Sequence, residues 1–298
     1  MTRDETTRVG ERTGRVVVVT GAGRGLGREH ALALAAAGDR VVVNDVDPAA
    51  EAVVAEIAAT GGTAVASVGD VADWAYARHL VESAVETFGR LDALVNNAGL
   101  VRDRMLVNLS EQEWDEVVRV DLKGHAAPLR HAAAYWRERS RAGDPVAARV
   151  VNTSSGAGLM GSVGQVNYAA AKAGVTALTQ VAAVELARYG VTVNAIAPSA
   201  RTAMTETAFA DAMRAPDEGF DPMAAGNVSP LVVWLAGADA GDVTGRIFEV
   251  AGGAVSVADG WRHGEPVDAG RRWRPEELGP VVRDLLRRTP APTPVYGA

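Results

Sequence analysis

The stretch RVVVVTGAGRGLGREHALALAAA, residues 15–37, decides the fold. Arg15–Thr20 is a short apolar run rich in β-branched residues, which predicts a buried parallel strand, and Arg28–Ala37 predicts a helix. Glycines at alternate positions from Gly21 to Gly27 fill the turn between them. Such a turn lets the backbone approach a pyrophosphate, while the helix N-terminus supplies free N–H groups and the positive end of its dipole. The stretch therefore predicts a dinucleotide-binding site.

The next predicted strand, Arg40–Asp45, ends in an acidic residue 24 positions after Gly21. A carboxylate there accepts hydrogen bonds from the adenosine ribose hydroxyls. It also repels a 2′-phosphate, because a like-charge pair at ~4 Å costs about 4 kcal/mol at an effective dielectric constant near 20. Arg24 in the glycine loop could attract that phosphate or pair with an acid elsewhere. Asp45 is the nearer of the two, so we expect the cofactor to be NAD(H).

Apolar strands alternate with helical patterns along the rest of the chain. The predicted strands are Arg15–Thr20, Arg40–Asp45, Thr63–Val68, Ala93–Asn96, Arg149–Thr153, Thr192–Ile196 and Ile247–Val250. The predicted helices between them lie near Pro48–Thr60, Trp74–Phe88, Glu111–Glu138, Val166–Tyr189 and Pro230–Gly237. This alternation favours right-handed βαβ crossovers. We expect a single α/β domain of Rossmann type, with a doubly wound, seven-stranded parallel sheet and helices on both faces.

Candidate binding residues lie at, or just after, the ends of the predicted strands. They are Gly21, Asp45, Asp70, Asn97, Ser155 and Pro198. Ligands of doubly wound sheets bind at the carboxyl ends of the strands. We therefore expect these residues to share one edge of the sheet.

Tyr168, Lys172 and Ser155 form a candidate proton-transfer site. Tyr168 and Lys172 are four residues apart and share a helix face, and Ser155 precedes the tyrosine by thirteen residues. Of the 30 basic residues only Lys123 and Lys172 are lysines, which indicates a need for a compact ammonium group at Lys172. That ammonium favours ionisation of the phenol, whose ordinary pKa is about 10.

Together these residues resemble the classical short-chain dehydrogenase/reductase family. The motifs, in chain order, are Thr20-Gly21-x-x-x-Gly25-x-Gly27, Asp70-Val71, Asn96-Asn97-Ala98-Gly99, Ser155, Tyr168-x-x-x-Lys172 and Asn194-Ala195-Ile196-Ala197-Pro198. The likeness covers about Gly14 to Trp261. It implies hydride transfer between a nicotinamide cofactor and a secondary alcohol or ketone.

The resemblance also implies residue roles. Tyr168 is the general acid and base, a contribution of about 10² to 10⁴ in rate. Lys172 holds the nicotinamide ribose and favours the phenolate, and Ser155 orients the substrate oxygen. Asp70 and Val71 border the adenine, Asn97 braces the sheet, and Thr202 reaches the nicotinamide amide. The implied cofactor-binding set is Gly21, Arg24, Gly25, Leu26, Gly27, Asp45, Asp70, Val71, Asn97, Ala98, Gly99, Tyr168, Lys172, Pro198 and Thr202.

Asp121 departs from the family pattern. Many members carry Asn where this chain has Asp121-Leu122-Lys123-Gly124, and the Asn carbonyl there holds a water of a proton relay to the lysine. Aspartate keeps that carbonyl but adds a negative charge that opposes the effect of Lys172 on Tyr168. We expect Asp121 to support catalysis, with the relay an open point.

A narrower resemblance concerns the substrate. Several stretches resemble the 3-hydroxyacyl-CoA dehydrogenase domain of peroxisomal multifunctional enzymes and its bacterial single-domain relatives. They are Val43-Asn44-Asp45, Leu100–Arg104, Gly164–Tyr168, Ser229–Leu235, Ile247–Val250 and Gly260-Trp261. Alternatives are a steroid, terpenoid or polyketide ketoreductase, a 3-oxoacyl-carrier-protein reductase, or a protein that binds NAD without turnover. The intact Ser155/Tyr168/Lys172 set argues against the last.

Composition excludes several classes of function. The chain has 298 residues, no cysteine and a net charge of −7 with a sequence pI near 5.3, which argues against thiol chemistry and nucleic-acid binding. Its five histidines show no ligand-like spacing, so we expect no metal. The sequence has no apolar run near 18 residues and no signal-peptide start, so we expect a cytoplasmic protein that does not enter a membrane.

The expected organisation is an arm at 1–14, the catalytic domain at 15–261 and an extension at 262–298. Residues 202–227 are either the family's substrate lid or an ordinary surface loop. The extension carries an Arg-rich helix, Pro275–Arg288, which covers a neighbouring subunit, contacts an acidic ligand or simply faces solvent. The long helices near Glu111–Glu138 and Val166–Tyr189 pair between subunits in the family, which implies a homodimer or homotetramer.

Overall fold

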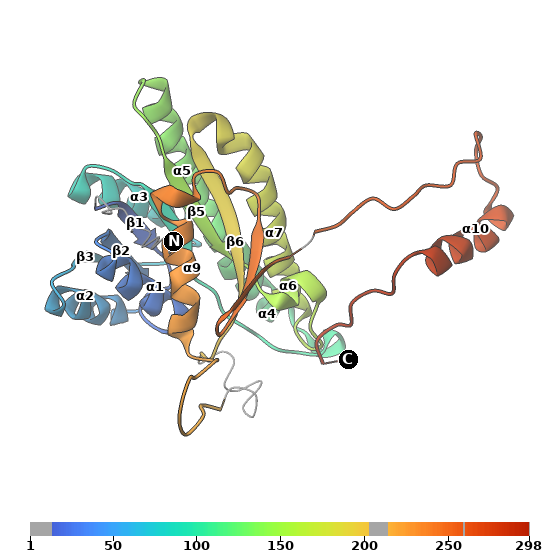
Figure 1. Ribbon diagram of the computed structural model, residues 1–298, viewed down its shortest axis with the longest axis horizontal. Coiled ribbons are helices and arrows are strands. Elements are labelled where there is room, and N and C mark those ends of the chain that lie inside the picture. The colour runs from blue at the N-terminus through green and yellow to red at the C-terminus, as the bar shows by residue number, and fades with distance from the viewer. Residues whose placement is uncertain (1–13, 203–213, 259, 298) are drawn as a thin grey trace, which may run out of the picture.

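Eight strands form one sheet at the centre of the molecule (Figure 1). The computed structural model describes residues 14–202, 214–258 and 260–297. The strands are β1 Val16–Val19, β2 Arg40–Asp45, β3 Thr63–Val68, β4 Ala93–Asn96, β5 Ala148–Thr153, β6 Val191–Ser199, β7 Ile247–Ala251 and β8 Ala254–Val257. Their order is β3-β2-β1-β4-β5-β6-β7-β8, so the strand order reverses beside β1 as in a doubly wound fold.

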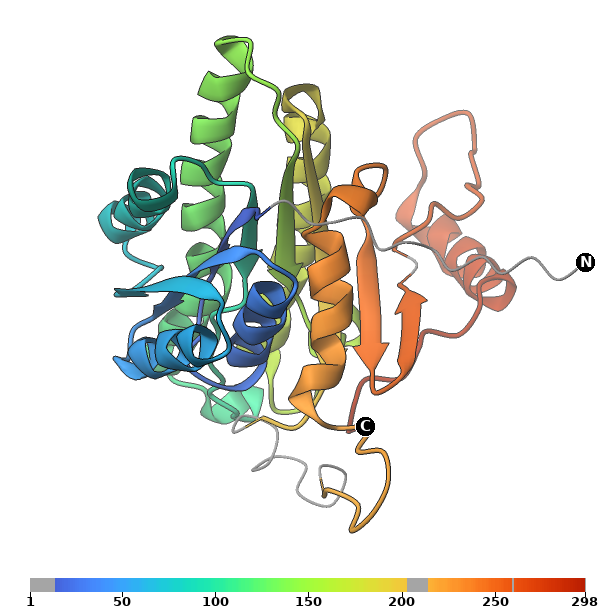
Figure 2. The same ribbon diagram turned by 60° about the vertical axis from the view of Figure 1, so that its left-hand side comes forward.

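Helices cover both faces of the sheet (Figure 2). They are α1 Gly25–Ala36, α2 Ala49–Ala59, α3 Trp74–Phe88, α4 Glu111–Val117, α5 Gly124–Arg141, α6 Gly156–Met160, α7 Val166–Leu186, α9 Ser229–Leu235 and α10 Pro275–Arg288. Short 3₁₀ turns occupy Leu106–Asn108, Ala187–Tyr189, Ala225–Val228 and Ala238–Ala240, and a π-helical segment occupies Val118–Lys123. None of the helices within the described ranges is long and apolar enough to cross a membrane.

Alternation along β1 divides the core between the two faces. Val17 and Val19 pack with α1, α2 and α9, whereas Val16 and Val18 pack with α3, α5 and α7. All four valines are fully buried, as a strand covered on both faces requires. The layers leave the carboxyl edge of the sheet open.

The predicted seven parallel strands are confirmed, but the predicted strand count is wrong by one. β8 pairs antiparallel with β7, and Ala251 lies opposite Ala254 across the two-residue turn Gly252-Gly253. Gly252 has a φ of 55°, the left-handed value that such a turn requires. The Gly-Gly pair between two apolar runs was the available hairpin signal.

The predicted helix at Glu111–Glu138 is divided in the structure. It consists of α4, the π-helical segment Val118–Lys123 and α5, which continues to Arg141. Asp121 lies in the π-helical segment, and such wider turns occur frequently at functional sites. Another difference concerns Pro198, which was expected just after a strand but lies inside β6.

The extension leaves the sheet domain after β8 and returns to it. The predicted helix Pro275–Arg288 is confirmed as α10, and Figure 1 shows it well apart from the sheet. The C-terminal end comes back beside α6. The predicted arm lies outside the described residues except for Gly14, and so do residues 203–213 of the predicted lid.

Candidate active site

The loop between β1 and α1 requires glycine. Gly21 and Gly25 have φ values of 61° and 54°, which side chains rarely adopt. A Cβ on Gly27 would lie 2.2 Å from the carbonyl oxygen of Gly21, so glycine is needed for this close approach. Arg24, the N-cap residue of α1, makes no side-chain hydrogen bond to the helix, and the first turn of α1 has no acidic residue. The first N–H groups of α1 therefore suit an anion such as a pyrophosphate.

Asn97 ties the glycine loop to the end of β4. Its Nδ2 atom donates to the carbonyl oxygens of Thr20 and Gly21, each at 3.1 Å. Thr20 Oγ1 in turn accepts the backbone N–H groups of Asn97 at 3.0 Å and Ala98 at 3.1 Å. These bonds fit the bracing role expected for Asn97.

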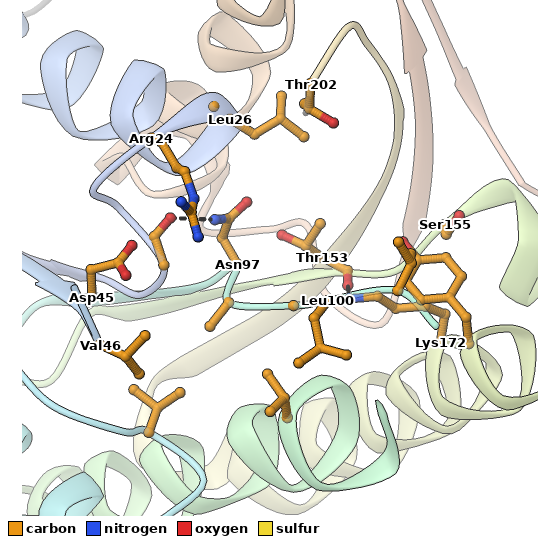
Figure 3. A pocket seen from close by; sticks show the side chains of 18 of the residues that line it. Arg24, Leu26, Asp45, Val46, Asn97, Leu100, Thr153, Ser155, Lys172 and Thr202 are labelled. Atoms are coloured by element: carbon orange, nitrogen blue, oxygen red, sulfur yellow. Dashed lines mark hydrogen bonds between the residues drawn. The ribbon is translucent and has the colours of Figure 1, made fainter. Parts of the chain in front are cut away.

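Asp45, the last residue of β2, holds the glycine loop through its carboxylate. Its Oδ2 atom accepts the N–H of Gly23 at 2.9 Å, and its Oδ1 atom accepts the N–H of Asp47 at 3.1 Å. The side chain is thus fixed beside the glycine turn, and Figure 3 shows Arg24, Asp45 and Asn97 grouped at this end of the cleft. Arg24 is exposed and also lines the cleft.

Ser155 lies at the opposite end of the cleft, where β5 passes into α6. It is the N-cap residue of α6, and its Oγ atom accepts the N–H of Ala157 at 3.2 Å. A Cβ on Gly158 would lie 2.7 Å from Cβ of Lys172, so α6 packs closely on α7 at the lysine. This packing sets Ser155 next to the two candidate residues of α7.

Tyr168 and Lys172 share one face of α7, as their spacing predicts. The Lys172 Nζ atom lies 5.5 Å from the centroid of the Tyr168 ring and donates a hydrogen bond to the carbonyl oxygen of Thr153 at 3.0 Å. Lys172 is 2% exposed, and burial lowers its pKa while nearby Asp121 raises it. The Lys172 ammonium is therefore fixed at the end of β5, beside Thr153 (Figure 3).

Asp121 and His125 are buried polar side chains behind the cleft, and the charge of Lys172 lowers the pKa of each. Asp121 Oδ1 accepts the N–H of Leu100 at 2.7 Å, whereas Oδ2 has no hydrogen-bond partner within the described chain. Burial raises the pKa of Asp121 to about 6, although the charge of Lys172 opposes this rise. Burial, and then the charge of Lys172, hold the pKa of His125 well below its usual range, so this imidazole stays neutral.

The pKa of Tyr168 is raised above that of an ordinary phenol. Burial is the largest cause, and the carboxylate of Asp121 adds to it. A hydrogen bond with Ser155 lowers the pKa, and the carboxylate of Asp103 raises it further. We expected Lys172 to lower the pKa of Tyr168, but the net effect of the described side chains is to raise it. Tyr168 remains a protonated phenol, which can donate its proton.

One cleft of about 1000 Å³ brings most of the predicted site residues together. Those that line it are Gly21, Arg24, Gly25, Leu26, Asp45, Asp70, Val71, Asn97, Ala98, Gly99, Ser155, Tyr168, Lys172, Pro198 and Thr202. The other two predicted residues do not line it. Gly27 is buried under the loop, and Asp121 is fully buried behind Gly99. Within the described ranges no group of three or more His, Cys, Asp or Glu residues could hold a metal ion.

Several cleft residues were not predicted. Arg119 lines the cleft and pairs with Asp70, Gln165 lines it and donates to Asp103, and Thr153 offers a carbonyl oxygen to Lys172. A backbone carbonyl leaves no signal in the side-chain pattern. His125 is buried four residues after Asp121, and this helical spacing could have indicated a second polar side chain behind the cleft.

The fold and the cleft agree with the comparison of this chain with known families. Residues 15–213 match the family described as short chain dehydrogenase. The chain belongs to this family, and it is an oxidoreductase that acts on CH–OH groups.

Known relatives support the narrower resemblance. The chain is 49% identical over 290 residues to the hydroxyacyl-CoA dehydrogenase ChsB1 of Mycobacterium tuberculosis, an alignment that covers 94% of this chain and 91% of that protein. It is 41% identical over 254 residues to the peroxisomal multifunctional enzyme type 2 of Drosophila melanogaster, which covers 82% of this chain and 40% of that longer protein. The crystal structure of a short chain dehydrogenase from Mycobacterium avium has a TM-score of 0.90 and 60% identity, covering 97% of this chain and 100% of the other.

Proposed function

We propose that this protein is an NAD(H)-dependent dehydrogenase that interconverts a 3-hydroxyacyl-CoA and the matching 3-oxoacyl-CoA. The observation that carries the proposal is the convergence of Ser155, Tyr168 and Lys172 at one end of the cleft, with Asp45 at the other. The hydroxyacyl-CoA dehydrogenase among the relatives supports this substrate class.

Tyr168 transfers the proton at the substrate oxygen. As a protonated phenol it donates to the oxygen of a bound ketone, and as a phenolate it accepts the proton of the alcohol. Ser155 hydrogen-bonds the same oxygen and stabilises the charge that develops there. Because burial raises the pKa of Tyr168, the described side chains favour the donating form. We therefore expect alcohol oxidation to be faster at alkaline pH.

The other end of the cleft fits an NAD molecule. The N–H groups at the start of α1 would hold the pyrophosphate, Asp45 the adenosine ribose, Asp70 and Val71 the adenine, and Lys172 the nicotinamide ribose. The nicotinamide, when bound, supplies the hydride chemistry. Leu26, Pro198 and Thr202 would border the nicotinamide side and exclude water from it. Thr202 lies close to the loop, since a Cβ on Gly25 would be 3.8 Å from its Cγ2 atom.

We also propose that the chain assembles as a homodimer or homotetramer through α5 and α7. Val181 and Val184 lie about one turn apart on α7 and are 57% and 80% exposed, so they offer apolar contact area on the surface of this helix. Light scattering of the purified protein measures the assembly directly. A monomer at micromolar concentration would contradict this proposal.

The proposed activity is tested by NADH formation with a panel of alcohols. The panel contains (3R)- and (3S)-3-hydroxyacyl-CoA esters, steroid alcohols and simple secondary alcohols, each with NAD or NADP. We expect NAD-dependent turnover of an acyl-CoA ester, with kcat/KM lowered by about 10² to 10⁴ in Tyr168→Phe. The matched control is Tyr135→Phe on α5, which should stay close to wild type. Turnover confined to steroids or simple alcohols would sink the acyl-CoA assignment and leave the reaction class intact.

A further inference from the structure

The C-terminal end of the chain pairs with the loop between α6 and α7. The N–H of Val163 donates to the carbonyl oxygen of Tyr296 at 2.9 Å, and the N–H of Tyr296 donates to that of Gly161 at 3.3 Å. A parallel β-bridge joins Ser162 to Tyr296. Val295 also packs here, since a Cβ on Gly161 would lie 3.2 Å from its Cγ1 atom. Residues 295–297 are thus attached next to the active site, although the chain reaches them only after the α10 excursion (Figure 1).

A third segment lies along the other side of the same loop. The N–H of Arg104 donates to the carbonyl oxygen of Gly164 at 2.8 Å, and a parallel bridge joins Arg104 to Gln165. Met105 follows, with its sulfur 4.0 Å from the Cβ position of Gly164. Residues 104–107, 161–165 and 295–297 therefore lie side by side.

These three segments expose apolar side chains next to Gln165, which lines the cleft. The members, which we call the apolar rim, are Met105, Leu106, Val107, Val163, Val295 and Tyr296, with exposures between 40% and 89%. The charge next to them is paired, because Arg104 contacts Glu113 at 3.0 Å. Clustered exposed apolar groups beside a cleft indicate a binding surface.

The apolar rim is continuous with the reacting end of the cleft. Gln165 lines the cleft and forms a β-bridge with Arg104, which is the neighbour of the rim residue Met105. On the other side, the Tyr296 hydroxyl lies 2.8 Å from the Cβ position of Gly156, the residue after Ser155. A molecule held at Ser155 and Tyr168 would therefore extend directly onto the rim.

We propose that the apolar rim binds the apolar part of the substrate, and that the C-terminal residues Val295 and Tyr296 set the preference for long substrates. This inference rests on the proposed function for the identity of the acyl chain. The rim contributes contact area to the carbon chain beyond the reacting carbon. It makes no contact with the reacting atoms, so Tyr296 is a specificity residue and Ser155, Tyr168 and Lys172 perform the chemistry.

The test compares chain-length preference in wild type, Tyr296→Ala and a chain that ends at Pro294. The matched control is Val255→Ala on β8, which removes an apolar side chain of similar exposure away from the cleft. Two substrate pairs are used with NAD, 3-hydroxybutanoyl-CoA with 3-hydroxydodecanoyl-CoA, and 2-butanol with 2-decanol. We expect the shortened chain to lose about tenfold in kcat/KM for the longer member of each pair and less than about twofold for the shorter, because buried apolar area drives binding. Tyr296→Ala should lose about threefold in kcat/KM for the longer member of each pair, which is half of the tenfold loss on a logarithmic scale.

The two substrate pairs distinguish failure of the rim from failure of the proposed function. If neither acyl-CoA reacts but the shortened chain still loses its preference for 2-decanol, the acyl-CoA assignment fails and the rim stands. An unchanged length preference in the shortened chain for both pairs overturns the rim. A wild-type enzyme that shows no preference for the longer member of either pair overturns it as well. Thermal melting of each variant checks that the fold is kept.

Discussion

Asp121 and Lys172 both lie against the Cα atom of Gly99. A Cβ there would be 2.8 Å from Asp121 Oδ1 and 3.4 Å from Lys172 Nζ. The carboxylate comes from the π-helical segment Val118–Lys123, and the ammonium comes from α7. Because both groups are buried, their charges are poorly screened, and the carboxylate of Asp121 also raises the pKa of Tyr168.

Replacing Asp121 by Asn tests this coupling in the pH profile. The carboxylate of Asp121 raises the pKa of Tyr168, so the neutral amide in Asp121→Asn should lower it. The alkaline rise of kcat/KM for alcohol oxidation should therefore move to lower pH, with oxidation about threefold to tenfold faster near pH 8, since one pKa unit is a factor of ten. Below about pH 6 the two enzymes should converge, because Asp121 is then protonated in the wild type.

The control for this profile is Asp115→Asn on α4, which removes an exposed carboxylate of the same region. Its profile should overlay that of the wild type. A profile for Asp121→Asn that also overlays the wild type would mean that the pKa of Tyr168 does not depend on the charge of Asp121. A shift to higher pH would mean that the loss of support for the Lys172 charge outweighs the direct effect, since Asp121 raises the pKa of that lysine.

The same substitution should stabilise the protein at neutral pH. Burial raises the pKa of Asp121 from 3.8 to about 6, so the folded state binds an extra proton between these values and stability falls as pH rises through this window. Above it, the buried charge costs about 3 kcal/mol, at about 1.4 kcal/mol per unit. We expect Asp121→Asn to raise the free energy of unfolding by about 1–3 kcal/mol at pH 7 and to have little effect near pH 4. Denaturant unfolding of wild type and Asp121→Asn at several pH values measures the difference in the free energy of unfolding. His125 is present in both proteins, so its own titration cancels from this difference.

Asp92→Asn provides a control of opposite sign. The buried carboxylate of Asp92 accepts hydrogen bonds from Arg90 Nε and from the N–H of Val16, both at 2.9 Å. Removing its charge should destabilise the protein at neutral pH. If Asp121→Asn destabilised the protein to the same degree, its carboxylate would be stabilising and the raised pKa would be wrong.

The glycine loop and the sheet could be predicted because their sequence signals are local. An apolar run followed by Gly21, Gly25 and Gly27 allows few backbone conformations, and the observed φ angles and close approach are those the pattern requires. The register of Tyr168 and Lys172 follows from the pitch of one helix. Each of these predictions needed only neighbours along the chain.

Other features depend on contacts between distant segments. The net rise in the pKa of Tyr168 comes from burial and from Asp121, which lies 47 positions earlier in the sequence. The π-helical segment that aims Asp121 at Gly99 has no distinctive composition. The pairing of Tyr296 with Val163 joins the end of the chain to the loop between α6 and α7 across the whole extension. No local pattern contains this information.

Asp45 should decide which dinucleotide the enzyme prefers, and the substitution Asp45→Asn tests this. The carboxylate is fixed by the N–H groups of Gly23 and Asp47, so it cannot move away from an incoming 2′-phosphate. The carboxylate and a 2′-phosphate at ~4 Å repel each other by up to about 4 kcal/mol. Asparagine removes this repulsion, and its side-chain oxygen can still accept one of the two N–H groups. We expect the ratio of kcat/KM for NADP to that for NAD to rise about 10- to 100-fold. Asp47→Asn, an exposed neighbour on the same loop, is the control and should leave the ratio nearly unchanged. A wild-type enzyme that already prefers NADP would show that Arg24 dominates the site.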